Sequence, residues 1–376
     1  MGTSASIVVA HGAAGSGYRM VADALAREIT SLAGDTARVD VLDAHSFGPA
    51  RFAGIPDDTL WSPETVGGVV RVFSTWALPR AYRRFAEKLV ETKPLAVVCT
   101  HPLPAFVAAA AVASGRLKTT VVAVSANYGT PGAWPRTDVS LYCAADDRSA
   151  DELVSNRGQR EDTVAVTGIP VRAQFTLEYD LAAAREHFDL PHVKRLILAL
   201  AGSTLPGPYS QFKDALAVSL PALASIPDTA VVVVTGRDDE FAEDLKSRSA
   251  AFGVGNVHTL GFVEHMAPLM AVADVALAIP GGVVCAECAA MGLPVVLMGP
   301  ATGHERINAD VLVEAGAALF ARDPRTIAEY TRKAISSTSR LKRMSEAATT
   351  ISRPFAATDV AERVLTLVGV PFGEPE

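Results

Sequence analysis

Short apolar runs, each followed by a segment of helical length, recur along most of this chain. The runs hold four to seven residues, rich in valine, leucine and alanine, with little alternation of apolar and polar positions. Such runs are typical of strands buried on both faces, as in parallel sheets covered by helices. The alternation therefore predicts an α/β fold. We expect strands at residues 6–10, 38–42, 95–100, 120–125, 139–144, 195–201, 230–235, 257–260, 273–279, 295–298 and 317–321.

The length of 376 residues predicts two domains, because a single core rarely grows beyond about 250–300 residues. No repeat of short period is present, and each half carries about one Rossmann-like unit of strands and helices. We therefore expect two Rossmann-like domains facing across a cleft, residues 1–175 and residues 176–376. The last helix can cross back from the second domain onto the first.

Composition excludes several classes of protein. Apolar residues make up 49% of the chain, charged residues 20%, and the formal net charge is −7. These values indicate a globular protein and argue against a nucleic-acid partner. No apolar run reaches the roughly 18–20 residues of a membrane span, and the first residues lack the basic region of a signal peptide. We therefore expect a cytoplasmic protein.

The cysteines do not form a disulfide framework or a metal site in this interpretation. Cys285 and Cys288 are spaced C-x-x-C, but they fall inside a predicted helix and no second pair completes a zinc site. We expect them to be small core residues. We expect no bound metal and no cofactor.

The stretch from residue 278 to residue 308 carries the strongest functional signal. Pro280 ends a strand, Gly281 and Gly282 allow a tight turn, and residues 283–291 have helical composition. A helix that begins after a glycine turn at the carboxyl end of a parallel strand is suited to binding an anion. We infer a diphosphate at Gly281, Gly282 and Val283. The alternative is that the two glycines only form a turn.

Polar positions cluster around this turn. Glu287 lies about one helical turn beyond it and can reach a ribose hydroxyl, although a solvated helix position is the alternative. The next strand ends before a loop that holds Gly303, His304, Glu305 and Asn308. Because carboxyl ends of parallel strands share one edge of a sheet, we expect these residues beside the turn.

The motif P-G-G…E…G-L-P followed by G-x-E-x-x-N resembles the donor half of nucleotide-sugar glycosyltransferases of the two-Rossmann (GT-B) type. The resemblance is to the branch of the monogalactosyldiacylglycerol synthases and of the N-acetylglucosaminyltransferase that makes the peptidoglycan lipid precursor. It implies a UDP-sugar as co-substrate. His304 stands where that branch usually has a glutamine that touches the donor sugar. A GlcNAc, Glc or Gal type of sugar therefore stays open.

The resemblance implies further donor-binding residues. A loop with Gly202 and Ser203 follows the first strand of the second half and would face the donor phosphates. Gly236 and Arg237 end the next strand. The backbone at Phe262 and Val263 would recognise the base.

The first half resembles the acceptor side of the same branch. The segment GSGYRMVADAL, with Gly17, resembles its first acceptor loop, and Tyr18 replaces the histidine usual there. His101 follows a strand in THPLPAFV, and histidine is suited to deprotonating an acceptor hydroxyl near neutral pH. The alternative role of His101 is to cap the next helix. We rank His101 first as base, His11 second and Tyr18 third.

Two more segments bear on the acceptor. The loop ANYGTPGAWP replaces the stretch usual in the branch, so Asn127, Tyr128 and Trp134 are candidate acceptor-binding residues. Residues 68–92 carry several arginines and lysines. The resemblance to lipid-glycosylating transferases implies that they contact the inner face of a membrane peripherally, and a solvated helix face is the alternative.

The resemblance implies direct, inverting displacement without a protein-bound metal. No D-x-D pair occupies the expected loop, and Asp146-Asp147 and Asp238-Asp239 fit first-turn acids. The acceptor would be a lipid or a small molecule; high alanine and low lysine content indicates a bacterial protein, and such enzymes also serve natural-product biosynthesis. The alternatives are a nucleotide-sugar epimerase of the same fold and a non-catalytic nucleotide-sugar binder.

Overall fold

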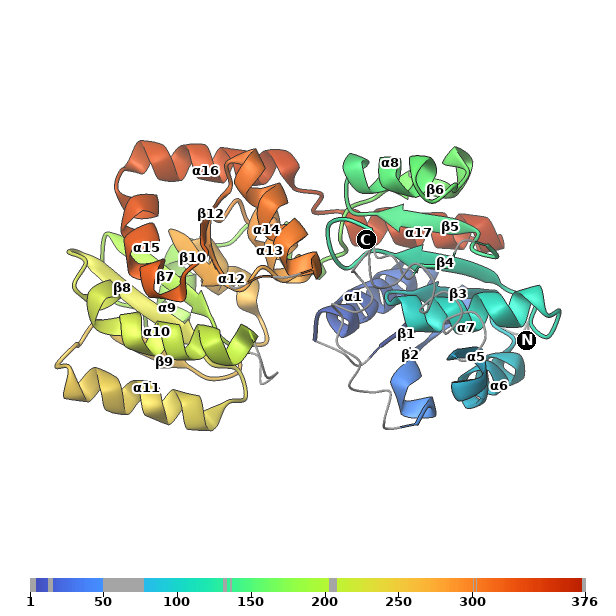
Figure 1. Cartoon of the computed structure of the whole chain (residues 1–376), viewed down its shortest axis with the longest axis horizontal. Coiled ribbons are helices and arrows are strands. Elements are labelled where there is room, and N and C mark those ends of the chain that lie inside the picture. The colour runs from blue at the N-terminus through green and yellow to red at the C-terminus, as the bar shows by residue number, and fades with distance from the viewer. Residues whose placement is uncertain are drawn as a thin grey trace. The chain divides into compact units, whose positions relative to one another are not determined.

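The chain divides into two compact α/β units. In the computed structural model these are Met1–Ala173 together with Arg353–Glu376, and Gln174–Ser352 (Figure 1). The described residues are 5–12, 16–49, 78–130, 134–135, 137–202, 208–299, 301 and 303–373. Ser203, part of the basic segment 68–92 and part of the loop around Trp134 therefore lie outside the described residues.

The first unit is built on a parallel six-stranded sheet in the order β2-β1-β3-β4-β5-β6. Its elements are β1 (Ala5–His11), α1 (Ser16–Ala33), η1 (Gly34–Thr36), β2 (Ala37–Asp43), η2 (Ala44–Phe47), α5 (Leu78–Ala81), α6 (Arg83–Thr92), β3 (Ala96–Cys99), α7 (Pro102–Ala113), β4 (Thr120–Val124), β5 (Leu141–Ala144), α8 (Asp147–Ser155), η5 (Glu161–Thr163), β6 (Val164–Val166) and α17 (Ala356–Val368).

The second unit has its own parallel six-stranded sheet in the order β12-β11-β10-β7-β8-β9. Its elements are α9 (Leu181–His187), β7 (Arg195–Leu200), α10 (Pro208–Ala224), β8 (Thr229–Val234), α11 (Asp239–Ala251), β9 (Val257–Leu260), α12 (Met266–Val272), β10 (Val275–Ala278), α13 (Gly282–Ala290), β11 (Val295–Met298), α14 (Gly303–Ala315), β12 (Ala318–Ala321), η7 (Pro324–Thr326), α15 (Ile327–Ile335) and α16 (Thr338–Ile351). A short turn, η6 (Ala173–Thr176), lies where the units divide.

Continuous burial of the central strands explains their composition. All residues of β3, β5, β8, β10 and β11 are buried, as parallel strands covered on both faces require. The predicted α/β class and every predicted strand are confirmed. The structure adds β6, which was not among the predicted strands. Cys285 and Cys288 are buried in α13, as expected of core residues, and burial raises the pKa of both thiols.

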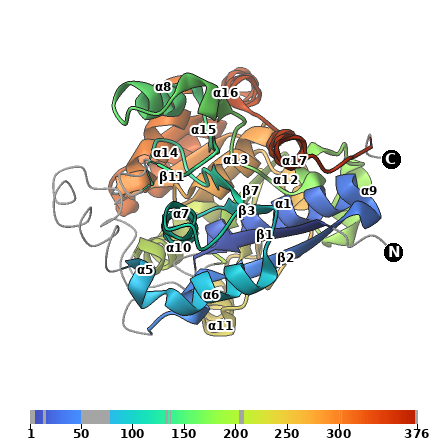
Figure 2. The same ribbon diagram turned by 90° about the vertical axis from the view of Figure 1, so that its right-hand side faces the viewer.

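The last helix, α17, belongs to the first unit. It contacts α1 along its length and lies beside it in Figure 2. The hydroxyl of Thr358 donates to the Glu28 carboxylate at 2.8 Å, and Val360, Val364 and Leu365 are fully buried. The chain therefore completes the core of its first unit only after building the second.

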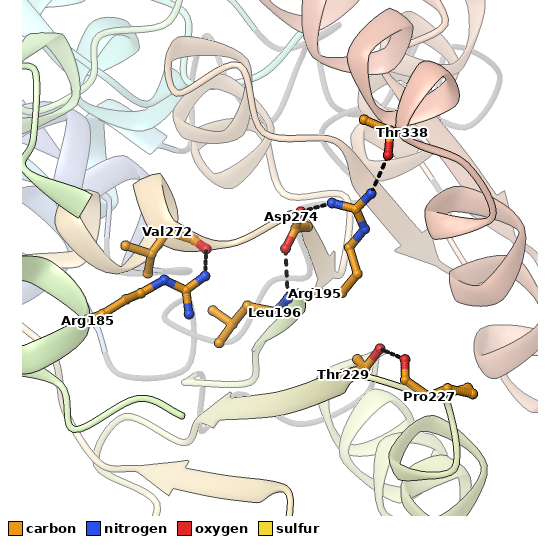
Figure 3. Close-up of polar contacts among 8 residues, drawn as sticks. All are labelled: Arg185, Arg195, Leu196, Pro227, Thr229, Val272, Asp274 and Thr338. Carbon is orange, nitrogen blue, oxygen red and sulfur yellow. Dashed lines mark hydrogen bonds and ion pairs between the residues drawn. The ribbon is translucent and has the colours of Figure 1, made fainter. Parts of the chain in front are cut away.

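Polar residues at the amino ends of the second sheet's strands have a structural role. Arg195 pairs with Asp274 at 2.8 Å and donates to the hydroxyl of Thr338 (Figure 3). The second carboxylate oxygen of Asp274 accepts the backbone N–H of Leu196. Asp274 therefore ties the start of β7 to the segment before β10. It precedes the strand that we had predicted to include it.

Candidate functional site

The predicted donor residues gather at one edge of the second sheet. β7 lies between β10 and β8, so the strand order reverses between β7 and β10. In open α/β sheets, ligands bind outside the carboxyl ends of the strands at such a switch point. Gly202 follows β7, and Gly281 follows β10. The two glycine segments therefore flank the switch point.

The turn after β10 leads directly into α13. Gly281 is the N-cap of this helix, has extended backbone and, as a glycine, offers no capping side chain of its own. The positive end of the helix dipole thus meets the sheet edge, as an anion site requires. The Gly281 amide itself donates to the carbonyl of Ile279 at 2.8 Å. The Gly281 amide is therefore engaged within the turn and is not available for the predicted anion.

Asn308 holds this turn in place. It is fully buried in α14, and its Nδ2 donates to the carbonyl of Pro280 at 2.9 Å. The bond joins the start of α14 to the end of β10. Asn308, which was predicted to bind the donor sugar, therefore positions the turn after β10.

Two carboxylates lie in the same helices. Glu287 in α13 is 6% exposed and Glu305 in α14 is 9% exposed, whereas glutamates are rarely this buried unless they have partners. Gly303 begins α14 with a positive φ of 50°, and the partly buried His304 follows it. The sequence predicted a loop here, whereas the structure places Gly303, His304 and Glu305 in the first turn of α14.

Gly236 is required by a close approach of two backbones. Its φ is +63°, and a Cβ at this position would lie 2.6 Å from the carbonyl oxygen of Gly202. The carboxyl ends of β7 and β8 therefore approach each other more closely than any side chain would allow.

The next residues extend the same edge. The Arg237 guanidinium lies over the ring of Phe262, 4.7 Å from its centroid, and Phe262 is 60% exposed. Val263 follows in the segment after β9. Asp238 caps α11 by accepting the amide of Phe241 and pairs with Lys213, and hydrogen bonding to Lys213 lowers the pKa of Asp238.

The first unit has an equivalent switch point between β1 and β3. His11 ends β1, and His101 follows β3 after Thr100. Tyr18, in the first turn of α1 after Gly17, meets the ring of His101 edge-on with centroids 4.7 Å apart. Nδ2 of Asn127, beyond β4, lies 3.5 Å from the hydroxyl of Tyr18. Both predicted histidines, Tyr18 and Asn127 therefore share one edge.

His101 caps the helix that follows it. Its Nδ1 accepts the backbone N–H of Leu103 at 3.1 Å. A neutral imidazole has one acceptor and one donor nitrogen, so this bond leaves the proton on Nε2. Neutral His101 therefore has no lone pair left to accept a proton. The geometry favours the capping alternative for His101.

His11 is the better placed of the two histidines for accepting a proton. It is 7% exposed, and its Nδ1 is buried with no hydrogen-bond partner among the residues described. The imidazole of His11 therefore retains a nitrogen that no other protein group in that set uses. These hydrogen bonds favour His11 over His101 as the candidate base, the opposite of the order predicted.

Two aromatic residues predicted to bind the acceptor are buried. Trp134 is 5% exposed and belongs to the hydrophobic core of the first unit, so its indole is a core side chain and the acceptor role predicted for it is not supported. Tyr128 is equally buried. The backbone beside it is anchored to α8, because Gly129 donates to the Ser149 hydroxyl at 3.0 Å.

Sequence reasoning missed three residues at this edge. The first is Gly12. A Cβ at this position would lie 2.7 Å from Nδ1 of His101, so glycine allows the imidazole to pack against the backbone. The other two are His45, whose ring lies beside that of His101, and Tyr82, whose ring lies beside that of His45. The glycine-rich stretch after β1 was a usable signal for Gly12. No motif marked the other two.

Two kinds of feature are absent from the described residues. No group of three or more His, Cys, Asp or Glu side chains there could hold a metal ion. No helix in those ranges is long and apolar enough to cross a bilayer. In α6, Arg83 and Lys88 form ion pairs with Glu87 and Glu91, as a solvated helix face does.

Comparison with known families gives two matches. Residues 208–364 match the glycosyltransferase family 28 C-terminal domain, and residues 71–171 match monogalactosyldiacylglycerol synthase. Processive diacylglycerol beta-glucosyltransferase of Bacillus mycoides (strain KBAB4) is 28% identical over 232 residues, which is 62% of this chain and 58% of that protein. The Bacillus licheniformis protein of the same name is 29% identical over 211 residues, 56% of this chain and 53% of that protein.

Solved structures share the fold. Acinetobacter baumannii MurG has a TM-score of 0.63 at 17% identity and covers 97% of this chain and 100% of its own. A UDP complex of S. aureus MnaA has a TM-score of 0.64 at 14% identity and covers 97% of each chain. These matches confirm the predicted resemblance to the GT-B transferases.

Proposed function

We propose that this protein transfers a hexose from a UDP-sugar to a hydroxyl acceptor. Its matches to the glycosyltransferase family 28 C-terminal domain and to monogalactosyldiacylglycerol synthase support this function. The observation that carries the proposal is the start of α13 at the switch point of the second sheet, with Asn308 fastening the turn before it. A UDP-sugar supplies both the anion for this helix end and the sugar to be moved.

The donor is held in this proposal by the edge of the second sheet. The diphosphate lies at Gly282 and Val283 with the Gly202 segment opposite, and Glu287 accepts hydrogen bonds from ribose hydroxyls. His304 and Glu305 contact the sugar, and the backbone at Phe262 and Val263 reads the base. The UDP in the S. aureus MnaA complex supports the nucleotide class for this fold.

The reaction is a direct displacement with inversion. The acceptor oxygen bonds to the anomeric carbon as the bond between that carbon and the diphosphate oxygen breaks. The hydroxyl proton passes to His11, while Nε2–H of His101 donates to the acceptor. The α13 dipole stabilises the charge on the leaving UDP, so the mechanism needs no protein-bound metal.

The acceptor proposed first is a diacylglycerol-type lipid, because the Bacillus relatives are diacylglycerol glucosyltransferases by name. Such an acceptor requires peripheral contact with the inner membrane face. A small natural-product hydroxyl is the second choice. The alignment covers 58% of the B. mycoides relative. The acceptor pocket of this chain can therefore differ from that of the relative.

The test supplies UDP-glucose, UDP-galactose or UDP-N-acetylglucosamine with diacylglycerol vesicles, and measures released UDP and glycolipid. We expect UDP to raise the melting temperature and one donor to give product. Gly282→Trp should abolish both. Val218→Trp, on the exposed face of α10 in the same unit, is the matched control and should change neither.

Two other functions give different results in the same assay. UDP-N-acetylglucosamine 2-epimerases share the fold, as the Neisseria meningitidis structure does at a TM-score of 0.62 and 16% identity. An epimerase would convert that sugar without any acceptor, which NMR of the sugar detects. A non-catalytic binder would show the UDP-dependent rise in melting temperature without turnover of any donor.

A further inference from the structure

A third histidine, His45, lies at the acceptor edge of the first sheet. It is in η2, directly after the carboxyl end of β2, whose last residue Asp43 lies opposite His11 of β1. The ring of His45 meets that of His101 with centroids 5.9 Å apart at 67°. No motif and no comparison assigns it a role.

Its surroundings hold His45 in place. The Asp43 carboxylate accepts the backbone N–H of His45 at 2.9 Å, which fixes the start of η2. The Tyr82 hydroxyl lies 3.5 Å from Nδ1 of His45, and the two rings meet edge-on at 5.9 Å. Tyr82 is itself almost fully buried.

The position of Tyr82 depends on a glycine. A Cβ on Gly48 would lie 2.1 Å from a carbon of the Tyr82 ring, so any other residue would displace that ring. Gly48 is also the C-cap of η2, and its amide donates to the carbonyl of His45 at 3.1 Å. The turn that carries His45 thus leaves room for the Tyr82 ring at Gly48. A hydrogen bond within its own backbone stabilises the same turn.

The four rings form a continuous row: Tyr82, His45, His101 and Tyr18. Successive centroids are 5.9, 5.9 and 4.7 Å apart, within the range that favours edge-to-face contact. His101 is held at Nδ1 by Leu103 and is contacted by a ring from Tyr18 and a ring from His45. The plane of its imidazole, and hence the direction of Nε2, is set by these contacts.

We propose that His45 is a positioning residue for His101 in the acceptor site, acting through the contact between their rings. The proposal rests on the proposed transferase function. Aligning the acceptor hydroxyl requires the Nε2–H of His101 to point in one direction, and small misplacements of a catalytic group cost large factors in rate. His45 restricts the imidazole on the side facing β2.

The kinetic test compares His45→Ala with His45→Phe. The alanine variant should lower kcat for transfer by about tenfold while leaving UDP affinity unchanged, since the donor residues belong to the other unit. The phenylalanine variant keeps a ring and should restore most of kcat. His187→Ala, in α9 of the second unit, is the control. Wild-type kcat in His45→Ala, or equal losses in both variants, would overturn the proposal.

A second measurement does not need turnover. In protein labelled at histidine, the ring resonances of His101, assigned with His101→Asn, should shift in His45→Ala and return toward the wild-type position in His45→Phe. Unchanged His101 resonances in His45→Ala would overturn the proposal. Absence of transfer by the wild-type protein would instead refute the proposed function, and the NMR result would still decide the role of His45.

Discussion

At the scale of single residues, the two histidines of the first sheet have different chemistry because their hydrogen bonds differ. His101 uses Nδ1 for the amide of Leu103, whereas Nδ1 of His11 has no such partner among the described residues. The sequence showed only that a histidine follows each strand. Which nitrogen retains a lone pair depends on the capping bond, which forms only when the helix does.

The capping role of His101 can be separated from a role in transfer. Asparagine is among the best N-cap residues and alanine among the poor ones, so His101→Ala should lower the free energy of unfolding by about 1 kcal/mol. His101→Asn should keep nearly wild-type stability. Both variants should lose transfer, because neither presents Nε2–H. Urea unfolding measures the stability and steady-state kinetics measure the transfer. Wild-type transfer by His101→Asn would show that His101 only caps the helix.

Gly236 offers a second test at this scale. Gly236→Ala places a Cβ 2.6 Å from the Gly202 carbonyl in a left-handed backbone, so the two loops must separate. We expect UDP affinity to fall by at least about tenfold and stability to fall by about 1–3 kcal/mol. Calorimetric titration with UDP measures the affinity.

The control for Gly236 is Gly253. Its φ is also +63°, but a Cβ there would meet nothing within 4 Å. Gly253→Ala therefore reports the strain of the backbone alone. If both variants bind UDP as the wild type does, the approach of the two loops is irrelevant to the donor site.

At the scale of elements, helix starts are the sites where chemistry and stability meet. α13 begins at a glycine with no side-chain cap, whereas α11 begins at Asp238, which accepts an amide and pairs with Lys213. In the first arrangement the N-cap residue itself gives the helix start no side chain. The second satisfies the helix internally, which is the structural role that the sequence predicted for this acidic pair.

The stability contribution of Asp238 should depend on pH. Because hydrogen bonds from Lys213 and the Phe241 amide lower its pKa in the folded state, its contribution is present above the unfolded pKa of about 3.9 and is lost as pH falls through the folded value. Asp238→Ala should cost about 1–2 kcal/mol at pH 7. The difference from wild type should vanish at strongly acid pH, in urea unfolding at each pH.

The neighbouring acid serves as the comparison. Asp239 is exposed in the first turn of α11, and Asp239→Ala should change stability by less than about 0.5 kcal/mol at any pH. A loss in Asp238→Ala that persists undiminished at acid pH would contradict the assignment of the effect to the carboxylate.

At the scale of the whole molecule, the chain returns to its first unit through α17. This path means that the stability of the first unit depends on residues beyond the second. Leu365→Ala removes a fully buried side chain of α17 and should cost about 2–5 kcal/mol in the first unit. UDP binding should persist, because the proposed donor residues lie in the other unit.

Hydrogen exchange resolves this prediction by unit. Faster exchange is expected in β1 and β3 of the Leu365→Ala protein, with β7 and β10 unchanged. Leu367→Ala, at an exposed position of the same helix, is the control and should be near neutral. Equal acceleration in both sheets would show that the two units unfold together.

The amino-acid sequence by itself determined the α/β class, the strand positions and the donor motif, because these depend on local patterns: continuous apolar runs, a proline at a strand end and glycines before a helix. The structure decided what depends on distant contacts. Trp134 is buried in the core, and the ring of His45 lies beside that of His101. Nδ1 of His101 accepts the Leu103 amide, and the Gly281 amide donates to a carbonyl within its own turn. Strand order and ring contacts join residues far apart in the chain, so no local pattern could reveal them.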